Sequence, residues 1–197
     1  DWYLTDDGCA ANPVCFHDDN PKGVKIKLQV STREEPVLPV MPVDQIKQDY
    51  FAQLPFVPAA IPSLAFEEAV AEKIRAASQR SKIRDLHDLS EIAGRPLNQE
   101  LVRALAVVKL WNSGGDGLDY ERFAGRVMGS ADYDIADLTS LLRRDQKPDL
   151  KGMIARVTDG YRFLGNLTDA ERLLAGDGAR KNRSAATDLV DMLRKGG

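Results

Sequence analysis

The sequence predicts an α+β protein, with strands in the first third of the chain and a helical bundle in the remainder. Three observations support this class. Residues 24–31 alternate strictly between apolar and polar side chains, as a half-buried strand does. Prolines punctuate residues 36–62 and limit that segment to short edge strands. Beyond Asn98 the apolar residues recur at helical spacing, and strands followed by helices favour the α+β class.

The composition is that of a folded protein. The 197 residues are 43% hydrophobic and 29% charged, which allows one substantial core, or one core with a small helical appendage. The formal net charge of -3 gives no global attraction to nucleic acid, so a polyanion would have to meet a local basic patch. No apolar run approaches the roughly 20 residues of a membrane helix, and no signal segment opens the chain. We therefore expect a cytoplasmic protein that does not contact a membrane.

The first twenty residues are dominated by turn-forming Asp, Asn, Gly and Pro, which leave room for at most one short strand, at Trp2–Leu4. The chain opens on Asp1 and runs directly into aromatic residues, so we expect natural sequence upstream. Cys9, Cys15 and His17 could contribute to a metal site. A fourth ligand is not evident, and free thiols in a reducing compartment fit the pattern better.

Residues 24–31 predict one continuous strand. Its apolar face, which we expect to meet a core, consists of Val24, Ile26, Leu28 and Val30. Its polar face consists of Lys25, Lys27, Gln29 and Ser31. In the proline-rich segment that follows, we expect short edge strands near Val37–Val40 and Phe56–Val57.

A pair of helices comes next. Ser63 is a plausible N-cap for the first, and Glu67 and Glu68 lie early in it, where the helix dipole favours acidic residues. Its buried stripe is expected to contain Phe66, Val70, Ile74 and Ala77. The second helix begins near Arg84 and stops before Gly94.

The remaining sequence predicts helices only, which we assign to a C-terminal helical domain over residues 98–197, with residues 1–97 forming the first domain. The predicted helices are Gln99–Trp111, Asp119–Met128, Ile135–Arg144, Leu150–Leu164, Asp169–Leu174 and Ala185–Lys195. The aromatic residues expected in the core of this bundle are Trp111, Phe123, Tyr133, Tyr161 and Phe163. The basic residues at 180–183 could touch an RNA backbone, although charged ends are usually just solvated.

A lysine in the first helix of the pair stands out. Lys73 lies three residues after Val70 and directly before Ile74, so its stem must run along the edge of the buried stripe. An ammonium group in that position is only partly solvated and needs a fixed anionic partner, which a phosphate or a carboxylate would supply. Arg80 and Arg84 follow one and two turns later if the helix continues.

Asp85 and Asp88 are three residues apart and share a face at the start of the second helix. His87, between them, is expected to point away from both. Two interpretations stay open on the pattern alone. The lysine, arginines and aspartates form a structural ion-pair network that ties two helices together, or they form a site for a phosphate-bearing ligand.

The charged helix pair resembles the paired third and fourth motifs of the AbiEii/AbiGii abortive-infection toxin family of nucleotidyltransferases. The resemblance lies in Glu67-Glu68-x3-Glu72-Lys73-x-Arg75-Ala76-x3-Arg80, followed by Arg84-Asp85-Leu86-x-Asp88-Leu89. The strand and its tail at residues 27–34 are similar to the family's second motif. On this resemblance the sheet is the remnant of a nucleotidyltransferase-like sheet, and the protein is a bacterial toxin of a phage-defence toxin–antitoxin system.

The resemblance also implies a reaction and its partners. The family transfers a nucleotidyl group from a nucleoside triphosphate, in some members to the 3' end of tRNA, with Mg²⁺ as the metal. Carried over by position, Lys73, Asp85 and Asp88 are the catalytic residues. Lys73, Arg80 and Arg84 are the nucleotide-binding residues. A cognate antitoxin is the implied protein partner, and tRNA is the implied acceptor.

Two departures from the family pattern concern the metal. The sequence has Gln29 where the family's strand usually presents a carboxylate, and an amide is a poor magnesium ligand. The family's defining Asp-x-Asp pair is also absent, since the single match in spacing, Asp132-x-Asp134, follows the motif helices. We therefore predict no metal ligands in this chain and expect the chain alone to be inactive. The alternatives are a catalytically inactive relative that binds nucleotide or RNA, and a helical interaction protein.

Overall fold

The computed structural model describes residues 2–5, 8–17, 20–32, 34–129, 133–143 and 145–196. Contacts within the chain divide it into two compact units, Asp1–Glu35 and Pro36–Gly197. Strands come first and helices follow, which confirms the predicted α+β class. The predicted domain boundary between residues 97 and 98 stays a prediction.

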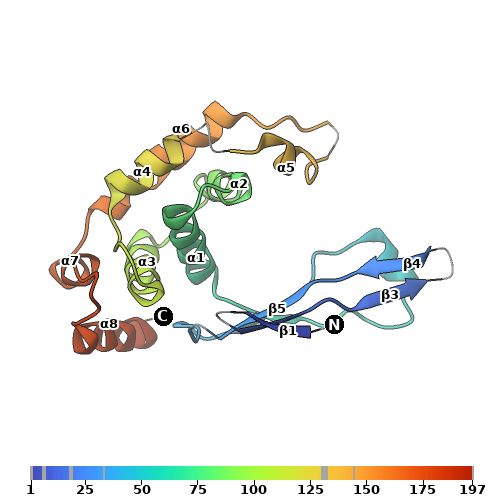
Figure 1. Cartoon of the computed structure of the whole chain (residues 1–197), viewed down its shortest axis with the longest axis horizontal. Coiled ribbons are helices and arrows are strands. Elements are labelled where there is room, and N and C mark those ends of the chain that lie inside the picture. Colours follow the sequence, from blue (N-terminus) through green and yellow to red (C-terminus); the bar gives the residue numbers. More distant parts are fainter. Residues whose placement is uncertain are drawn as a thin grey trace. The chain divides into compact units, whose positions relative to one another are not determined.

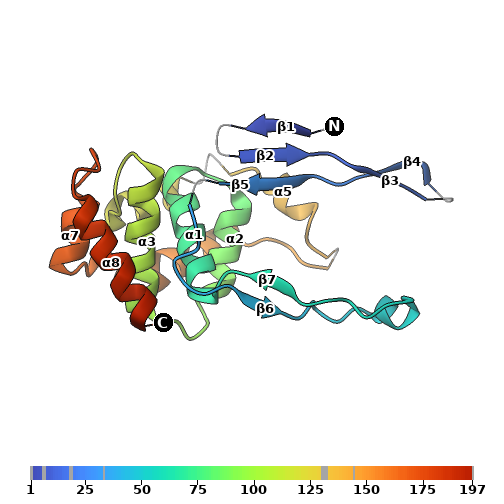
Figure 2. The same ribbon diagram turned by 90° about the horizontal axis from the view of Figure 1, so that it is seen from below.

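The first unit consists of short antiparallel strands. They are β1 (Trp2–Thr5), β2 (Gly8–Ala11), β3 (Val14–His17), β4 (Asn20–Lys25) and β5 (Leu28–Ser31). One sheet has the order β1-β2-β5, and β3 pairs with β4 as a separate hairpin (Figure 2). The prediction of at most one strand in the first twenty residues is therefore wrong. Backbone pairing between short strands overrides the turn-forming composition of that segment.

The strand predicted at residues 24–31 is interrupted. Ile26 and Lys27 lie between β4 and β5, and the Ile26 amide donates to the Pro13 carbonyl at 3.0 Å. The predicted burial is also wrong, because Leu28 and Val30 keep 55% and 56% of their surface exposed. Within its described residues this unit has only narrow two- and three-stranded sheets, which are too small to bury an apolar face.

The second unit begins with an extended segment and a β-hairpin. Strands β6 (Met41–Val43) and β7 (Ile61–Ser63) run antiparallel side by side, and a short 3-10 helix, η1 (Asp49–Gln53), lies between them in sequence (Figure 2). The edge strands predicted at Val37–Val40 and Phe56–Val57 are wrong. The amides of Val37 and Leu38 do not enter a ladder, because each donates to the Glu68 carboxylate at 2.8 Å.

Eight α-helices and a second 3-10 helix make up the described remainder of this unit. They are α1 (Phe66–Gln79), α2 (Ile83–Ile92), α3 (Gln99–Ser113), α4 (Tyr120–Met128), α5 (Ile135–Thr139), α6 (Leu150–Gly160), η3 (Arg162–Gly165), α7 (Asp169–Ala175) and α8 (Arg183–Gly196). Ser63 lies in β7, so the predicted N-cap is wrong; α1 follows Ala65 without a side-chain cap. Helix α5 ends before the predicted Arg144, which is outside the described residues.

Helix α3 is the centre of the core. All nine of its residues from Val102 to Leu110 are buried, and it packs against α1, α7 and α8 (Figure 1). The aromatic prediction is confirmed. Phe123, Tyr161 and Phe163 are buried, while Trp111 and Tyr133 are half-buried against the same core.

Two buried ion pairs tie α3 to its neighbours. The Lys109 ammonium lies 2.6 Å from a Glu68 carboxylate oxygen of α1, and both side chains are almost completely inaccessible. Arg103 pairs with Glu171 of α7 at 2.9 Å.

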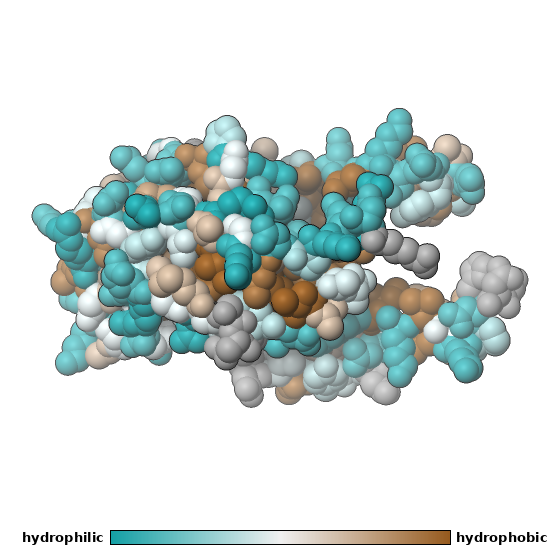
Figure 3. Space-filling model, turned by 90° about the horizontal axis from the view of Figure 1, so that it is seen from above, coloured by the Kyte–Doolittle hydropathy of each residue, from teal (hydrophilic) through white to brown (hydrophobic). Residues whose placement is uncertain are grey.

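The outer surface seen in Figure 3 is mostly hydrophilic, with apolar residues in smaller patches. No helix of the described residues is long and apolar enough to cross a membrane.

Candidate functional site

Helices α1 and α2 bring the predicted site residues together. Lys73 projects from α1 beside Ile74 and Val70, which are both fully buried, so its stem is held at the edge of the core as predicted. Helix α1 ends at Gln79, and Arg80 has an extended backbone with φ -148°. The chain therefore turns after α1, and α2 begins at Ile83. This turn places Asp85 opposite Lys73.

One buried carboxylate holds two cations. Asp85 Oδ1 lies 3.4 Å from Lys73 Nζ, and Asp85 Oδ2 accepts a hydrogen bond from Arg80 Nε at 2.9 Å. The Asp85 side chain is only 4% exposed, whereas the Arg80 side chain is 59% exposed. Asp88 Oδ2 completes the cluster at 2.6 Å from Lys73 Nζ. Lys73, Asp85, Asp88 and Arg80 thus form one connected ion-pair cluster.

The protonation of Lys73 follows from these contacts. Partial burial lowers the pKa of Lys73, but the hydrogen bond and the charge of Asp88, together with the charge and hydrogen bond of Asp85, outweigh that loss. The net effect raises the pKa of Lys73 above its ordinary value. Lys73 is therefore a fixed positive charge at neutral pH and cannot serve as a base there.

Arg84 and His87 lie beside this cluster. Arg84 Nε donates to Asp137 Oδ2 of α5 at 3.0 Å, a pairing across 53 residues that nothing in the sequence pattern indicates. Arg84 still lines a pocket of about 290 Å³ together with Lys73 and Asp88. His87 does not point away from both aspartates, since its Nδ1 lies 3.7 Å from Asp88 Oδ1. Its side chain is 27% exposed.

The described residues do not supply a metal site. Among them no group of three or more His, Cys, Asp or Glu side chains could hold an ion. Gln29, which the resemblance placed at a carboxylate position, pairs with Ala10 in the first unit. Asp134 caps α5 by accepting from two backbone amides, and Asp132 lies outside the described residues. Cys9 is half-buried and Cys15 exposed, and both are free thiols.

Comparison with known proteins decides the family. Residues 10–176 match the family described as the nucleotidyl transferase AbiEii toxin of a type IV toxin–antitoxin system. The chain belongs to this family. The match covers the whole helix pair, so the membership predicted from that stretch is confirmed. A comparison with curated proteins gives no match.

A solved structure shares the fold of this AbiEii family member. MenT4, a nucleotidyltransferase toxin from Mycobacterium tuberculosis H37Rv, is similar with a TM-score of 0.76 and 23% sequence identity. The alignment covers 94% of this chain and 68% of MenT4. At this identity the likeness concerns the fold. The family match and the shared fold together support a nucleotidyltransferase toxin-like function.

Family membership also gives the general chemistry. Nucleotidyl transfer uses a nucleoside triphosphate and, in general, a metal ion, and a toxin of a toxin–antitoxin system has an antitoxin partner. Such a site needs cations to hold the triphosphate and preorganised groups to stabilise charge as it moves between phosphate oxygens. In this chain, Lys73 and Arg80 are two cations that share one buried carboxylate.

Proposed function

We propose that Lys73 and Arg80 bind the triphosphate of the nucleotide substrate, and that Asp85 is the positioning residue that holds both of them. The observation that carries this proposal is the shared carboxylate. Asp85 uses one oxygen for each cation, at 3.4 Å and 2.9 Å, so the separation of the two positive charges is set by a single buried group. A preorganised pair of cations loses little freedom when a polyphosphate arrives.

Both cations keep hydrogen-bond donors for a ligand. A lysine ammonium has three N–H donors, and Lys73 directs two of them to Asp85 and Asp88. An arginine has five N–H donors, and Arg80 gives its Nε proton to Asp85. The remaining guanidinium donors sit on a side chain that is 59% exposed. Phosphate oxygens can reach them without displacing Asp85.

Asp88 has a different role in this proposal. It is the exposed partner of Lys73, at 43%, and its second oxygen faces His87 at 3.7 Å. Because it is not buried, it can leave Lys73 when a phosphate with greater negative charge replaces it. Asp88 therefore orients Lys73 in the unliganded site. Arg84, bound to Asp137, would join the triphosphate only after leaving that partner.

Magnesium is the metal that the family resemblance implies, and the described residues do not fit it. Magnesium takes carboxylate and phosphate oxygens in near-octahedral geometry. Asp85 has both oxygens committed to cations, and Gln29 offers an amide. We assign no step of the reaction to the metal. The proposed acceptor is the 3' end of tRNA, as in some members of the family.

Calorimetric titration with each of the four ribonucleoside triphosphates tests the proposal. Binding of at least one of them, weakened about tenfold or more by Lys73→Ala, is expected from the loss of one charge-assisted contact. Lys151→Ala, which removes an exposed lysine of α6, is the matched control and leaves the affinity unchanged. Equal binding by wild type and Lys73→Ala would reject the assignment.

A second candidate is a binding protein without transferase activity, which the absence of a metal-holding group among the described residues favours. Incubation with α-labelled nucleoside triphosphates and tRNA separates the two candidates. Label transferred to tRNA supports the enzyme. Nucleotide binding without any transfer supports the binding protein, and no binding at all leaves the cluster as a structural ion-pair network.

A further inference from the structure

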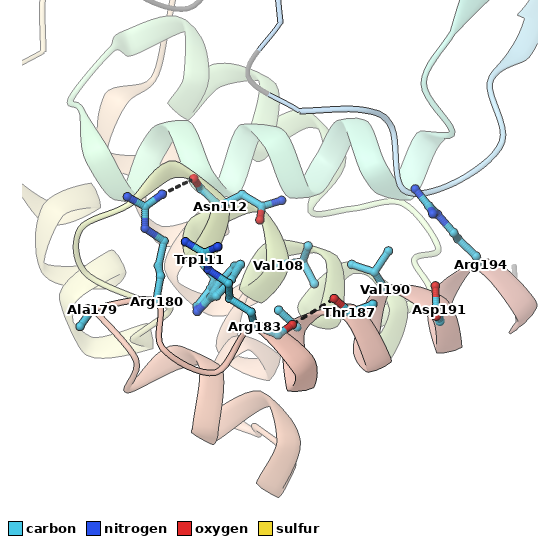
Figure 4. Close-up of a pocket in the computed structure, with 11 residues that line it drawn as sticks. Val108, Trp111, Asn112, Ala179, Arg180, Arg183, Thr187, Val190, Asp191 and Arg194 are labelled. Atoms are coloured by element: carbon cyan, nitrogen blue, oxygen red, sulfur yellow. Dashed lines mark hydrogen bonds between the residues drawn. The ribbon is translucent and has the colours of Figure 1, made fainter.

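A groove lies between α3 and α8, on the far side of α3 from the ion-pair cluster's helix α1. Its volume is about 670 Å³, within the range of sites that hold a small ligand. Figure 4 shows Trp111 and Val108 of α3 along one side and the residues of α8 and its preceding turn along the other. Trp111 is half-buried, so part of its indole ring faces the groove.

Three arginines surround the groove. Arg180, Arg183 and Arg194 all line it and are exposed, and the lining contains one acidic residue, Asp191. Among the described residues their hydrogen bonds go to backbone carbonyls and not to acidic side chains: Arg180 donates to Asn112 and Arg194 to Val37. Arg183 and Arg194 are eleven positions apart on one helix, which spaces them along roughly 16 Å of its axis. The groove thus has a basic rim in a chain whose net charge is -3.

The turn that carries Arg180 is fixed in place. Asp177 accepts hydrogen bonds from the amides of Asn182 and Lys181, at 2.7 Å and 2.9 Å, and from the indole of Trp111 at 3.2 Å. These backbone hydrogen bonds lower the pKa of Asp177. Arg180 has φ 52°, a left-handed conformation that costs energy in a residue with a side chain. The turn therefore fixes the position of Arg180 relative to Trp111.

The C-terminal end of α3 links the groove to the end of α1. Arg180 donates to the Asn112 carbonyl at 3.2 Å, at the C-terminal end of α3. The next residue, Ser113, receives a hydrogen bond from Gln79 at 2.7 Å, and Gln79 directly precedes Arg80. Two hydrogen bonds across adjacent helix ends therefore connect the arginine of the groove to the arginine of the cluster.

From this arrangement we infer that the groove binds a single strand of nucleic acid, with one base against Trp111 and the adjoining phosphates on Arg180 and Arg183. An unstacked base binds by stacking on an aromatic ring, and its phosphates bind to arginine guanidinium groups. Arginine also pairs with phosphate through two parallel hydrogen bonds. The inference does not rest on triphosphate binding at Lys73, since the two sites share no residue.

An acidic protein helix is the competing occupant and fits less well. A helix that docks in a groove needs a continuous apolar strip for its anchor residues. Here Asn112, Thr187 and Asp191 interrupt the apolar lining, and Trp111 is the only large ring. The residues that line the groove therefore favour a ligand with one flat apolar group and regularly spaced negative charges.

Tryptophan fluorescence provides a direct test. The chain has two tryptophans, so Trp2→Phe leaves Trp111 as the single reporter. In this variant, with Lys73→Ala added to remove the proposed triphosphate site, a uridylate hexamer is titrated at about 50 mM salt. We expect saturable quenching with a Kd below about 1 mM, and an affinity that falls as salt rises. Arg183→Ala raises that Kd about tenfold.

Matched controls and rival ligands complete the experiment. Arg162→Ala removes an exposed arginine outside the groove and should leave the Kd unchanged. Uridine monophosphate should quench more weakly than the hexamer, because it offers fewer phosphates. Hexaglutamate that quenches as strongly as the hexamer would overturn the inference, as would no quenching by the hexamer or equal binding by Arg183→Ala. Circular dichroism confirms that each variant is folded.

Discussion

Lys109→Met would remove one partner of the most deeply buried ion pair among the described residues. Lys109 and Glu68 lie 2.6 Å apart and are 2% and 0% exposed. Breaking such a pair costs about 3–5 kcal/mol, because the remaining charge is left buried without its partner. Glu68 would keep the two backbone amides of Val37 and Leu38, each at 2.8 Å, so the expected loss is about 3 kcal/mol.

For a chain of this length, such a loss lowers the Tm by about 6–12 °C. Thermal unfolding followed by circular dichroism measures the change. Arg172→Ala is the control, because its ion pair with Asp169 is 64% and 99% exposed and should contribute less than about 1 kcal/mol. If Lys109→Met lowered the Tm by less than about 2 °C, the argument from buried charge would be refuted.

Three further perturbations test other contacts. Gly117→Ala places a methyl group against the Ala175 carbonyl, so the backbone must move and the free energy of unfolding in urea should fall by about 1–3 kcal/mol. Tyr161→Phe removes a hydrogen bond of 3.1 Å to the Leu89 carbonyl, and a loss of about 1 kcal/mol in the same assay is expected. The raised pKa of Lys73 stabilises the fold below pH 10.5, and this contribution is lost as the pH rises through the raised value; Lys73→Met should therefore unfold with a weaker pH dependence above pH 10.5.

Helical spacing predicted most helices of the second unit, because amphipathic helices such as α4 and α8 bury one face each. α3, α4 and α7 lie within two residues of their predicted ends. The strands were less predictable, because each one forms only by pairing with another segment, which local sequence does not identify. The alternation at residues 24–31 indicated extended structure, but it showed neither the break at Ile26 and Lys27 nor the exposure of Leu28 and Val30.

The site was predictable in part. The family motif placed Lys73, Asp85 and Asp88 together, and their distances agree with one cluster. The resemblance implied that the two aspartates orient Lys73 and Arg80. The sequence did not indicate that Asp85 alone contacts both cations, because that geometry depends on α1 ending at Gln79. Nor could it indicate the groove, since Trp111 has the spacing of a core residue and meets the turn at residues 177–182 only through the packing of α8 on α3.

The shared carboxylate of Asp85 has a consequence for how the cluster responds to mutation. Lys73→Ala and Arg80→Ala each leave Asp85 with the other cation. Removing both cations leaves the buried negative charge of Asp85 without a partner. A double-mutant cycle should therefore give a combined loss larger than the sum of the single losses. Either cation can therefore compensate on Asp85 for the loss of the other, so the two positions tolerate single substitutions better than a double one.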